Sequence, residues 1–214
     1  MLKKWMIPSA ALFILAACND ENIGELVFED WEAAVEIEQE ISTIQEPLSE
    51  REQQESEWYQ EMLELSEVEE IEPLSEEAVT SAEERRDLME EEQQIIETSY
   101  DQFHESSEHV DQMEEEKQQA ADRVFEAMEE RYEAYQDLHD QYITSIDEDI
   151  TLYEMIASES VEIEELQEQH DTVNEMYSMI ADKNNAFNDA TEEFNEEKTN
   201  FYSTADLNVV DEEE

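Results

Sequence analysis

Residues that make turns are scarce in this sequence. Gly24 is the only glycine in 214 residues, and there are three prolines, of which Pro8 lies in the first ten residues. Sheet-rich and open α/β folds place Gly, Pro and Asn at the turns that join their elements. A chain with so few of these residues must consist of long helices with few corners. The sequence therefore predicts an all-α fold.

The N-terminus has the order of a signal peptide. Lys3 and Lys4 precede an apolar run from Trp5 to Ala17, which is followed by Cys18. A short basic region, an apolar region and small residues before a cleavage point are typical of such peptides. The apolar run is shorter than the roughly 20 residues that a helix needs to cross a bilayer. A retained transmembrane helix is therefore the weaker interpretation.

The end of the apolar run predicts a lipoprotein. Leu15-Ala16-Ala17-Cys18 matches the bacterial lipobox, an aliphatic residue and two small residues before a cysteine. In that chemistry the thiol of Cys18 receives S-diacylglycerol, the Ala17–Cys18 bond is cleaved, and the new N-terminus receives palmitate. The alternative is a cysteine that happens to end an ordinary signal peptide. Because Cys18 is the only cysteine, and a lone thiol in an exported protein needs an explanation, we predict lipidation.

The chain is strongly acidic. Its net charge is −55, and it becomes about −57 when Lys3 and Lys4 leave with the signal peptide. Such a charge excludes nucleic acid as a partner, because phosphates would be repelled. It also opposes attachment of the protein surface to an anionic leaflet, so we expect the lipid on Cys18 to hold the membrane. The acidity is typical of adaptation to high salt or to high pH, and the sequence leaves both open.

Apolar residues recur at helical spacing through most of the chain. The first helix is expected to end at Pro47 and the second at Pro73, because the residue before a proline resists helical geometry. In this interpretation Ser49 and Ser75 cap the helices that follow. A further turn is predicted between about residues 106 and 114, and another corner at Ala157-Ser158-Glu159-Ser160.

Two long heptad series predict helix–helix seams. The first series has five members at intervals of seven: Ala82, Met89, Ile96, Phe103 and Val110. The second has six: Leu166, Val173, Ile180, Phe187, Phe194 and Phe201. Its companion positions are mixed in polarity and are interpreted as layers that set the register: His170, Tyr177, Asn184, Thr191 and Lys198. The series predict an elongated antiparallel helical bundle or coiled coil of four to five helices.

The predicted organisation has four parts. Residues 1–17 are the signal peptide, and 18–24 are the lipidated cysteine with a short tether. Residues 25–207 form the helical domain, and 208–214 form an acidic tail. The number of copies in the functional protein stays open.

No motif for catalysis, a cofactor or a metal is present. With 65 acidic residues, pairs of carboxylates occur by chance at any spacing. The four histidines are dispersed, and His139 and His170 fall within apolar series where packing explains them. No glycine-containing motif supports an EF-hand, a phosphate loop or a serine nucleophile. Trp58 and Tyr59 are adjacent and cannot both face one helix stripe, so they are the candidate exposed contact.

The C-terminal third of the chain resembles a known family. Asn174-Glu175-Met176-Tyr177, Asn185-Ala186-Phe187-Asn188 and Phe201-Tyr202-Ser203-Thr204-Ala205-Asp206-Leu207 are similar to the closing segment of the YkyA-like lipoproteins of Bacillota. Members tend to read Ala-Gly-Leu where this chain has Ala205-Asp206-Leu207. Two earlier stretches also resemble that family, Glu130-Arg131-Tyr132-Glu133-Ala134-Tyr135 and Leu152-Tyr153-Glu154-Met155. With these and the lipobox, the resemblance covers nearly the whole chain. It implies an all-helical, cell-wall-binding lipoprotein, and it transfers no catalytic residues.

These observations lead to three hypotheses. The first is a lipid-anchored extracytoplasmic protein without catalytic activity that binds peptidoglycan or another envelope component. The second is a structural or adaptor coiled coil that binds an envelope protein. The third is an envelope hydrolase, which requires a pair of carboxylates in a cleft.

Overall fold

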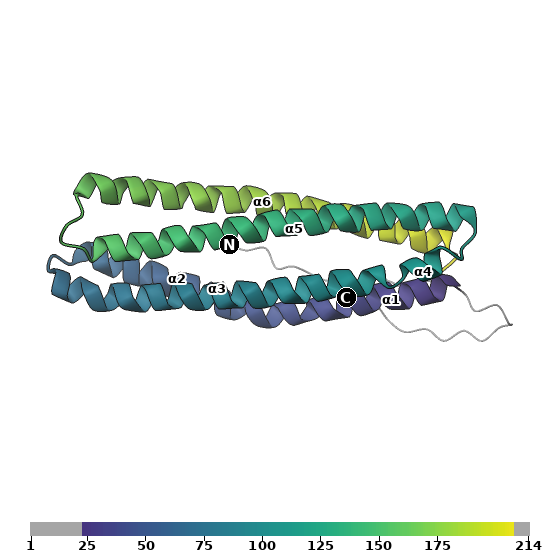
Figure 1. Ribbon diagram of the computed structural model, residues 1–214, viewed down its shortest axis with the longest axis horizontal. Coiled ribbons are helices and arrows are strands. Elements are labelled where there is room, and N and C mark those ends of the chain that lie inside the picture. The colour runs from purple at the N-terminus through teal and green to yellow at the C-terminus, as the bar shows by residue number, and fades with distance from the viewer. Residues whose placement is uncertain (1–22, 208–214) are drawn as a thin grey trace. The chain divides into compact units, whose positions relative to one another are not determined.

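The structure is a computed structural model that describes residues 23–207, and these residues contain helices and no strand (Figure 1). The predicted all-α fold is therefore confirmed. The elements in chain order are α1 (Ile23–Glu38), the 3-10 helix η1 (Gln39–Ile41), α2 (Ser42–Glu64), α3 (Val68–His104), α4 (Ser107–Val110), α5 (Glu115–Ile156) and α6 (Ile163–Thr204). At about 1.5 Å per residue, α5 and α6 are each roughly 63 Å long.

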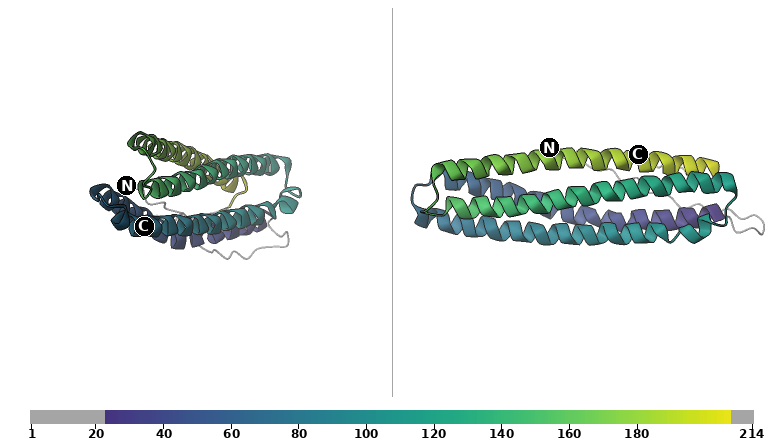
Figure 2. Two further views of the ribbon diagram at one scale, coloured as in Figure 1. Left: turned by 60° about the vertical axis from the view of Figure 1, so that its left-hand side comes forward. Right: turned by 45° about the horizontal axis from the view of Figure 1, so that its top comes forward.

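The described residues divide into two compact units. The first contains 23–40, 95–133 and 188–207, and the second contains 41–94 and 134–187. Each unit takes one segment from the α1–α2 run and one from each of α3, α5 and α6. Figures 1 and 2 show the segments within a unit running alongside one another. Because the connections are short, consecutive segments are antiparallel, as in a helical bundle.

An aromatic cluster around Trp31 forms the core of the first unit. The Trp31 side chain is fully buried. Its ring stacks on Phe103 at a centroid distance of 5.1 Å and contacts Phe201 at 4.7 Å. Its Nε1 donates a hydrogen bond of 2.8 Å to the Ser106 hydroxyl. The indole therefore adds a large apolar area to the core and also satisfies its one polar atom.

The second unit has a mixed core of aliphatic and tyrosine side chains. Ala78, Ala82 and Met89 on α3 pack with Tyr142, Ile146 and Tyr153 on α5. The heptad series from Ala82 to Val110 is buried at every position, which confirms that this face of α3 is a seam. The α6 series is buried at Val173, Phe187, Phe194 and Phe201 and partly buried at Leu166 and Ile180.

Both prolines lie inside helices, so the predicted ends at Pro47 and Pro73 are wrong. Pro47 is in α2 and Pro73 is in α3, each about one and a half turns from the helix start. A proline there removes one backbone hydrogen bond, to the carbonyl four residues earlier. Those carbonyls belong to Thr43 and Glu69, which are exposed and can be hydrated instead.

The serines after the two prolines are also inside helices, so the predicted caps at Ser49 and Ser75 are wrong. The hydroxyl of Ser75 donates a buried hydrogen bond of 2.7 Å to the carbonyl of Tyr153. The chain turns instead at residues 65–67, where Leu65 is extended with ψ 158° and ends α2. Ser75 therefore joins α3 to α5 and does not begin a helix.

The two remaining predicted corners are confirmed. Helix α3 ends at His104 and α5 begins at Glu115, with only the short α4 between them. Helix α5 ends at Ile156 and α6 begins at Ile163. The segment from residue 75 to 157 is therefore two long helices.

The end of α6 is a Schellman motif with an aspartate at its left-handed position. Asp206 has φ 61°. The backbone N–H of Leu207 donates to the carbonyl of Tyr202 at 2.9 Å, and that of Asp206 donates to the carbonyl of Ser203 at 3.4 Å. Glycine is the usual residue at this position. Aspartate tolerates it better than most other residues.

Candidate functional site

Polar residues recur along one face of α3, and each makes a polar contact to another helix. Arg85, Glu92 and Ser99 are seven residues apart, and Ser106 continues the spacing just beyond the helix. Arg85, Ser99 and Ser106 are fully buried. Each member of the row bonds a side chain from another helix. The row therefore creates successive polar layers within otherwise apolar seams.

Arg85 forms the largest layer, in the second unit. Its Nη2 lies 2.6 Å from Asp149 Oδ2 and 2.9 Å from Glu55 Oε2. Its Nη1 donates to the Tyr142 hydroxyl at 3.4 Å and lies 3.9 Å from Glu52 Oε1. The guanidinium thus joins α2, α3 and α5.

Hydroxyl groups complete the hydrogen bonding of the two buried carboxylates. Ser81 donates to Glu55 Oε1 at 2.8 Å, and Tyr153 donates to Glu55 Oε2 at 3.3 Å. Tyr177 on α6 donates to Asp149 Oδ2 at 2.8 Å. All four helices that pass through this unit therefore contribute to one network.

Burial controls the protonation of this layer. Removal from water raises the pKa of Glu55 and of Asp149, and the Arg85 cation only partly offsets the increase. Burial alone would disfavour the Arg85 cation, but the surrounding tyrosine and carboxylate oxygens more than compensate and raise its pKa. Arg85 therefore stays charged, and the two carboxyls hold protons more tightly than usual.

The Arg85 layer has no route for a substrate. Arg85, Glu55 and Asp149 are 0%, 1% and 2% exposed. A hydrolase needs its carboxyl pair in a cleft that admits a substrate and a water molecule. Within the described residues, these groups are instead enclosed by the helices that they join. The layer can fix which faces of the helices meet, because a slipped register would leave buried charge unpaired.

Glu92 forms a second polar layer in this unit. The Tyr135 hydroxyl donates to its Oε1 at 3.3 Å. Burial raises the pKa of Glu92 to about 7, against a small opposing effect of the tyrosine hydrogen bond. Its carboxyl therefore changes its protonation near neutral pH, well above the range of an exposed glutamate.

Arg131 and Glu38 form the principal polar layer of the first unit. Nη1 donates to Glu38 Oε1 at 2.9 Å and Nη2 donates to Oε2 at 2.6 Å. Ser99 on α3 donates to the same Oε1 at 2.9 Å. Nε of Arg131 donates to the Thr191 hydroxyl on α6 at 3.2 Å. This layer joins α1, α3, α5 and α6.

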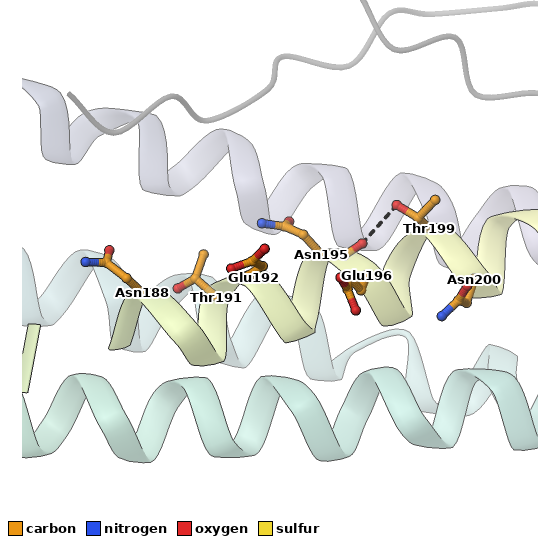
Figure 3. A pocket seen from close by; sticks show the side chains of 7 residues that line it. All are labelled: Asn188, Thr191, Glu192, Asn195, Glu196, Thr199 and Asn200. Atoms are coloured by element: carbon orange, nitrogen blue, oxygen red, sulfur yellow. Dashed lines mark hydrogen bonds between the residues drawn. The ribbon is translucent and has the colours of Figure 1, made fainter. Parts of the chain in front are cut away.

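A shallow recess lies on the outer face of α6 in the same unit. Figure 3 shows that the side chains lining it project from a single helix. They are Asn188, Thr191, Glu192, Asn195, Glu196, Thr199 and Asn200. The Thr199 hydroxyl donates to the Asn195 carbonyl at 2.9 Å, drawn dashed in Figure 3. This polar row, here called the α6 recess, is the candidate contact surface, and Thr191 links it to Arg131.

The structure places Trp58 and Tyr59, the predicted exposed contact, partly buried against the core of the second unit. The Tyr59 ring stacks on His170 at 5.9 Å, and its hydroxyl lies 3.1 Å from His170 Nδ1. Two adjacent aromatic residues can therefore both be partly buried, because each can pack against a different part of the same helix–helix seam.

Companion positions on α6 make polar contacts to other helices. His170 pairs with Tyr59, Tyr177 with Asp149, Thr191 with Arg131 and Lys198 with Glu32. These contacts place the four side chains between helices, and the interpretation that such layers set the register stays a prediction. The Arg85 and Arg131 layers were missed, although the seven-residue spacing of Arg85, Glu92 and Ser99 was a usable signal.

The N-terminal predictions fall outside the structure. Ala17, Cys18 and the lipobox lie before residue 23, so lipidation and cleavage remain predictions from the sequence. No helix in the described range is long and apolar enough to cross a membrane. The same residues contain no group of three or more His, Cys, Asp or Glu arranged to hold a metal ion.

Comparison with known proteins gives a family and a fold. The model of the YkyA family, described as "Putative cell-wall binding lipoprotein", matches residues 23–204. A crystal structure of a conserved protein of unknown function from Staphylococcus aureus superposes with a TM-score of 0.70 at 12% sequence identity. That match covers 83% of this chain and 91% of the other, and at this identity it supports the fold alone. No curated protein matches the sequence.

Proposed function

Because this chain belongs to the YkyA family, we propose that it is a lipid-anchored protein on the outer face of the cell membrane that binds the cell wall. The family match over residues 23–204 carries this proposal, and it agrees with the resemblance seen in the sequence. The anchor is the lipid on Cys18, and the helical domain that follows it carries the contact surface. The protein acts by binding and not by catalysis.

The placement of the buried carboxylates favours binding over catalysis. Glu55 and Asp149 are the pair held closest to a shared cation, yet both are enclosed in the core. The α6 recess has two carboxylates, Glu192 and Glu196, but they lie one turn apart on an open surface. An exposed carboxylate lacks the desolvation that raises the pKa of a general acid.

The charge of the chain limits which wall component it can contact. Anionic wall polymers are repelled by a surface with a net charge near −55, unless cations bridge them or high salt screens them. Contact is therefore directed to uncharged parts of the wall. The lipid on Cys18 keeps the protein close to the wall, so modest affinity is sufficient because anchoring raises the effective concentration.

Binding to purified peptidoglycan tests the proposal. The protein without its signal peptide and with Cys18→Ser is incubated with insoluble peptidoglycan at the salt concentration used for growth. We expect retention above that of an unrelated acidic helical protein of similar net charge. Equal release of the two proteins in the wash would exclude wall binding.

A second candidate function is supported by exposed apolar side chains. In the second unit, Ile163 is 72% exposed and Leu63 is 56% exposed. The adaptor hypothesis requires that such apolar residues belong to a contiguous patch that a protein partner covers. Cross-linking in cells separates the candidates, because a defined protein adduct at these positions supports the adaptor and wall-linked material supports wall binding.

A further inference from the structure

Asparagine is distributed unevenly along the chain. None occurs between Asn22 and Asn174, whereas five occur from residue 184 to residue 200. Asparagine is a poor helix former, at roughly 0.6 kcal/mol less favourable than alanine for each residue. Its concentration within α6 opposes helix stability, while glutamate and glutamine occupy the exposed faces elsewhere. The C-terminal half of α6 therefore carries these side chains for a reason other than helix formation.

Three of these asparagines line the α6 recess. Asn188, Asn195 and Asn200 alternate there with Thr191 and Thr199. The lining residues follow the three- and four-residue spacing of a single helix face. From Asn188 to Asn200 the row is about 18 Å long. It is an open, linear surface that suits an extended chain better than a compact small molecule.

The chemistry of the row indicates the class of ligand. An asparagine amide both donates and accepts hydrogen bonds, and so does a threonine hydroxyl. Among the described residues, no lysine or arginine lines the recess, and the two charged residues, Glu192 and Glu196, can only accept while they are ionised. An anionic polymer finds no cation here. A neutral chain rich in hydroxyl and amide groups finds a partner for each group.

We propose that the α6 recess binds an uncharged stretch of glycan composed of N-acetylated amino sugars. The proposal rests on the proposed wall-binding function and assigns it a surface. The acetamido groups of the sugar pair with Asn188, Asn195 and Asn200, and its hydroxyls donate to Glu192 and Glu196. Because the described residues that line the recess include no aromatic ring, affinity for a short oligomer is expected to be weak, about millimolar.

The buried side of the helix positions this surface. Thr191 accepts a hydrogen bond from Arg131, which is itself held by both oxygens of Glu38. Phe187, Phe194 and Phe201 are buried along the same segment of α6. A contact surface works best when its side chains stand on a rigid element. The Arg131 layer and the buried phenylalanines therefore hold in place the segment of α6 that carries the exposed polar row.

The test compares two variants that make the same substitutions in different places. In the first, Asn195→Ala and Asn200→Ala remove two amides from the recess. In the second, Asn174→Ala and Asn185→Ala remove two exposed amides from α6 outside it. Both keep the net charge, and alanine favours the helix, so both are expected to fold. Circular dichroism and thermal melting verify the fold before binding is measured.

Binding is measured with soluble β-1,4-linked N-acetylglucosamine oligomers and with insoluble peptidoglycan. In NMR titrations of the wild-type protein we expect the side-chain amide signals of Asn195 and Asn200 to shift with the oligomer. The recess variant should bind oligomer and peptidoglycan at least about tenfold more weakly, and the control variant should bind as the wild type does.

Failure of this inference can be distinguished from failure of the proposed function. If the wild-type protein does not bind peptidoglycan, the proposed function is wrong. If it binds peptidoglycan and both variants bind equally well, wall binding stands and the recess is not its site. If the recess variant loses peptidoglycan binding but the oligomer never binds, the glycan is the wrong ligand and this proposal is overturned.

Discussion

Arg131 holds Glu38 through two parallel hydrogen bonds, from Nη1 to Oε1 at 2.9 Å and from Nη2 to Oε2 at 2.6 Å. Both side chains are more than nine-tenths buried. A planar guanidinium matches a carboxylate in this way, and an ammonium group does not. The third donor direction of Arg131, through Nε, reaches Thr191. One side chain thus links α1 to the helix that carries the recess.

Arg131→Lys tests this relationship. Lysine keeps the charge but loses the paired geometry and the Thr191 contact, so we expect the free energy of unfolding to fall by about 1.5–3 kcal/mol. The matched control is Arg123→Lys in the same helix. Its pair with Glu197 is largely exposed, so the cost should be below about 1 kcal/mol. Urea denaturation measures both, and equal costs would contradict the assigned role.

Arg85→Met tests the layer in the second unit. Methionine leaves Glu55 and Asp149 buried without their cation, which we expect to cost about 3–5 kcal/mol. Arg86→Met is the control, because the neighbouring arginine pairs with the exposed Asp147 and should lose at most about 1 kcal/mol. Hydrogen exchange should show that the Arg85→Met variant loses protection mainly in residues 41–94 and 134–187. A uniform loss of protection would argue against a local layer.

Glu92→Gln should change how stability depends on pH. The ordinary pKa of this carboxyl is 4.5, and burial raises it to about 7 in the folded chain. Between these values the folded state binds more protons than the unfolded state, so the free energy of unfolding falls as the pH rises. Glutamine removes this penalty. At pH 8 the variant should be about 1–3 kcal/mol more stable than the wild type, and at pH 4 the difference should disappear.

The control for Glu92 is Glu91→Gln. Glu91 is the preceding residue on α3 and is exposed. This substitution removes the same charge without relieving burial, so it isolates the effect of the general negative charge. Thermal melting of both variants from pH 4 to pH 8 makes the comparison. If the two stabilities follow the same curve, burial of Glu92 is not responsible.

Asp206→Gly should stabilise the protein. Asp206 occupies the left-handed region, with φ 61°, which glycine enters at lower cost than aspartate. We expect a gain of about 0.5–1 kcal/mol. The same substitution at Asp189, an exposed position inside α6, should instead destabilise by about 0.5–1 kcal/mol. Opposite shifts in melting temperature support the motif, and shifts of the same sign would contradict it.

Cys18→Ser should abolish membrane attachment. Serine has no thiol to receive the diacylglyceryl group, so the variant should be released or remain as an uncleaved precursor. Asn19→Ser leaves the thiol and the lipobox intact and should behave as the wild type. Fractionation of cells followed by immunoblotting separates these outcomes. Normal processing and attachment of Cys18→Ser would show that the anchor lies elsewhere.

The sequence predicted the helical seams well because apolar spacing reports burial directly. Every member of the series from Ala82 to Val110 is buried, and the break between α3 and α5 overlaps the turn predicted between about residues 106 and 114. The helix ends predicted at Pro47 and Pro73 are wrong because the rule that a proline ends a helix does not hold near the start of a helix. Pro47 and Pro73 lie early in their helices, where a proline removes one hydrogen bond and the residues four positions earlier, Thr43 and Glu69, are exposed.

The polar layers were harder to predict because acidic residues are so common. With 65 aspartates and glutamates, nothing local distinguishes the buried Glu38, Glu55 and Asp149 from the exposed majority. Their partners come from helices far apart in the sequence, and only packing selects them. The basic residues carried more information, because arginine at a seam position needs a buried anion. The α6 recess likewise depends on which helix face packing leaves in water.

The short connections also determine how the protein resists degradation by proteases. A protease must draw an extended segment into its active site, and a helix has to open before it can be cut. Within the described residues, non-helical backbone is confined to 65–67, the turns around α4, 157–162 and 205–207. Cleavage elsewhere is therefore limited by the local opening equilibrium and not by access. The survival time of this protein in the presence of a protease is set by the stability of its helices.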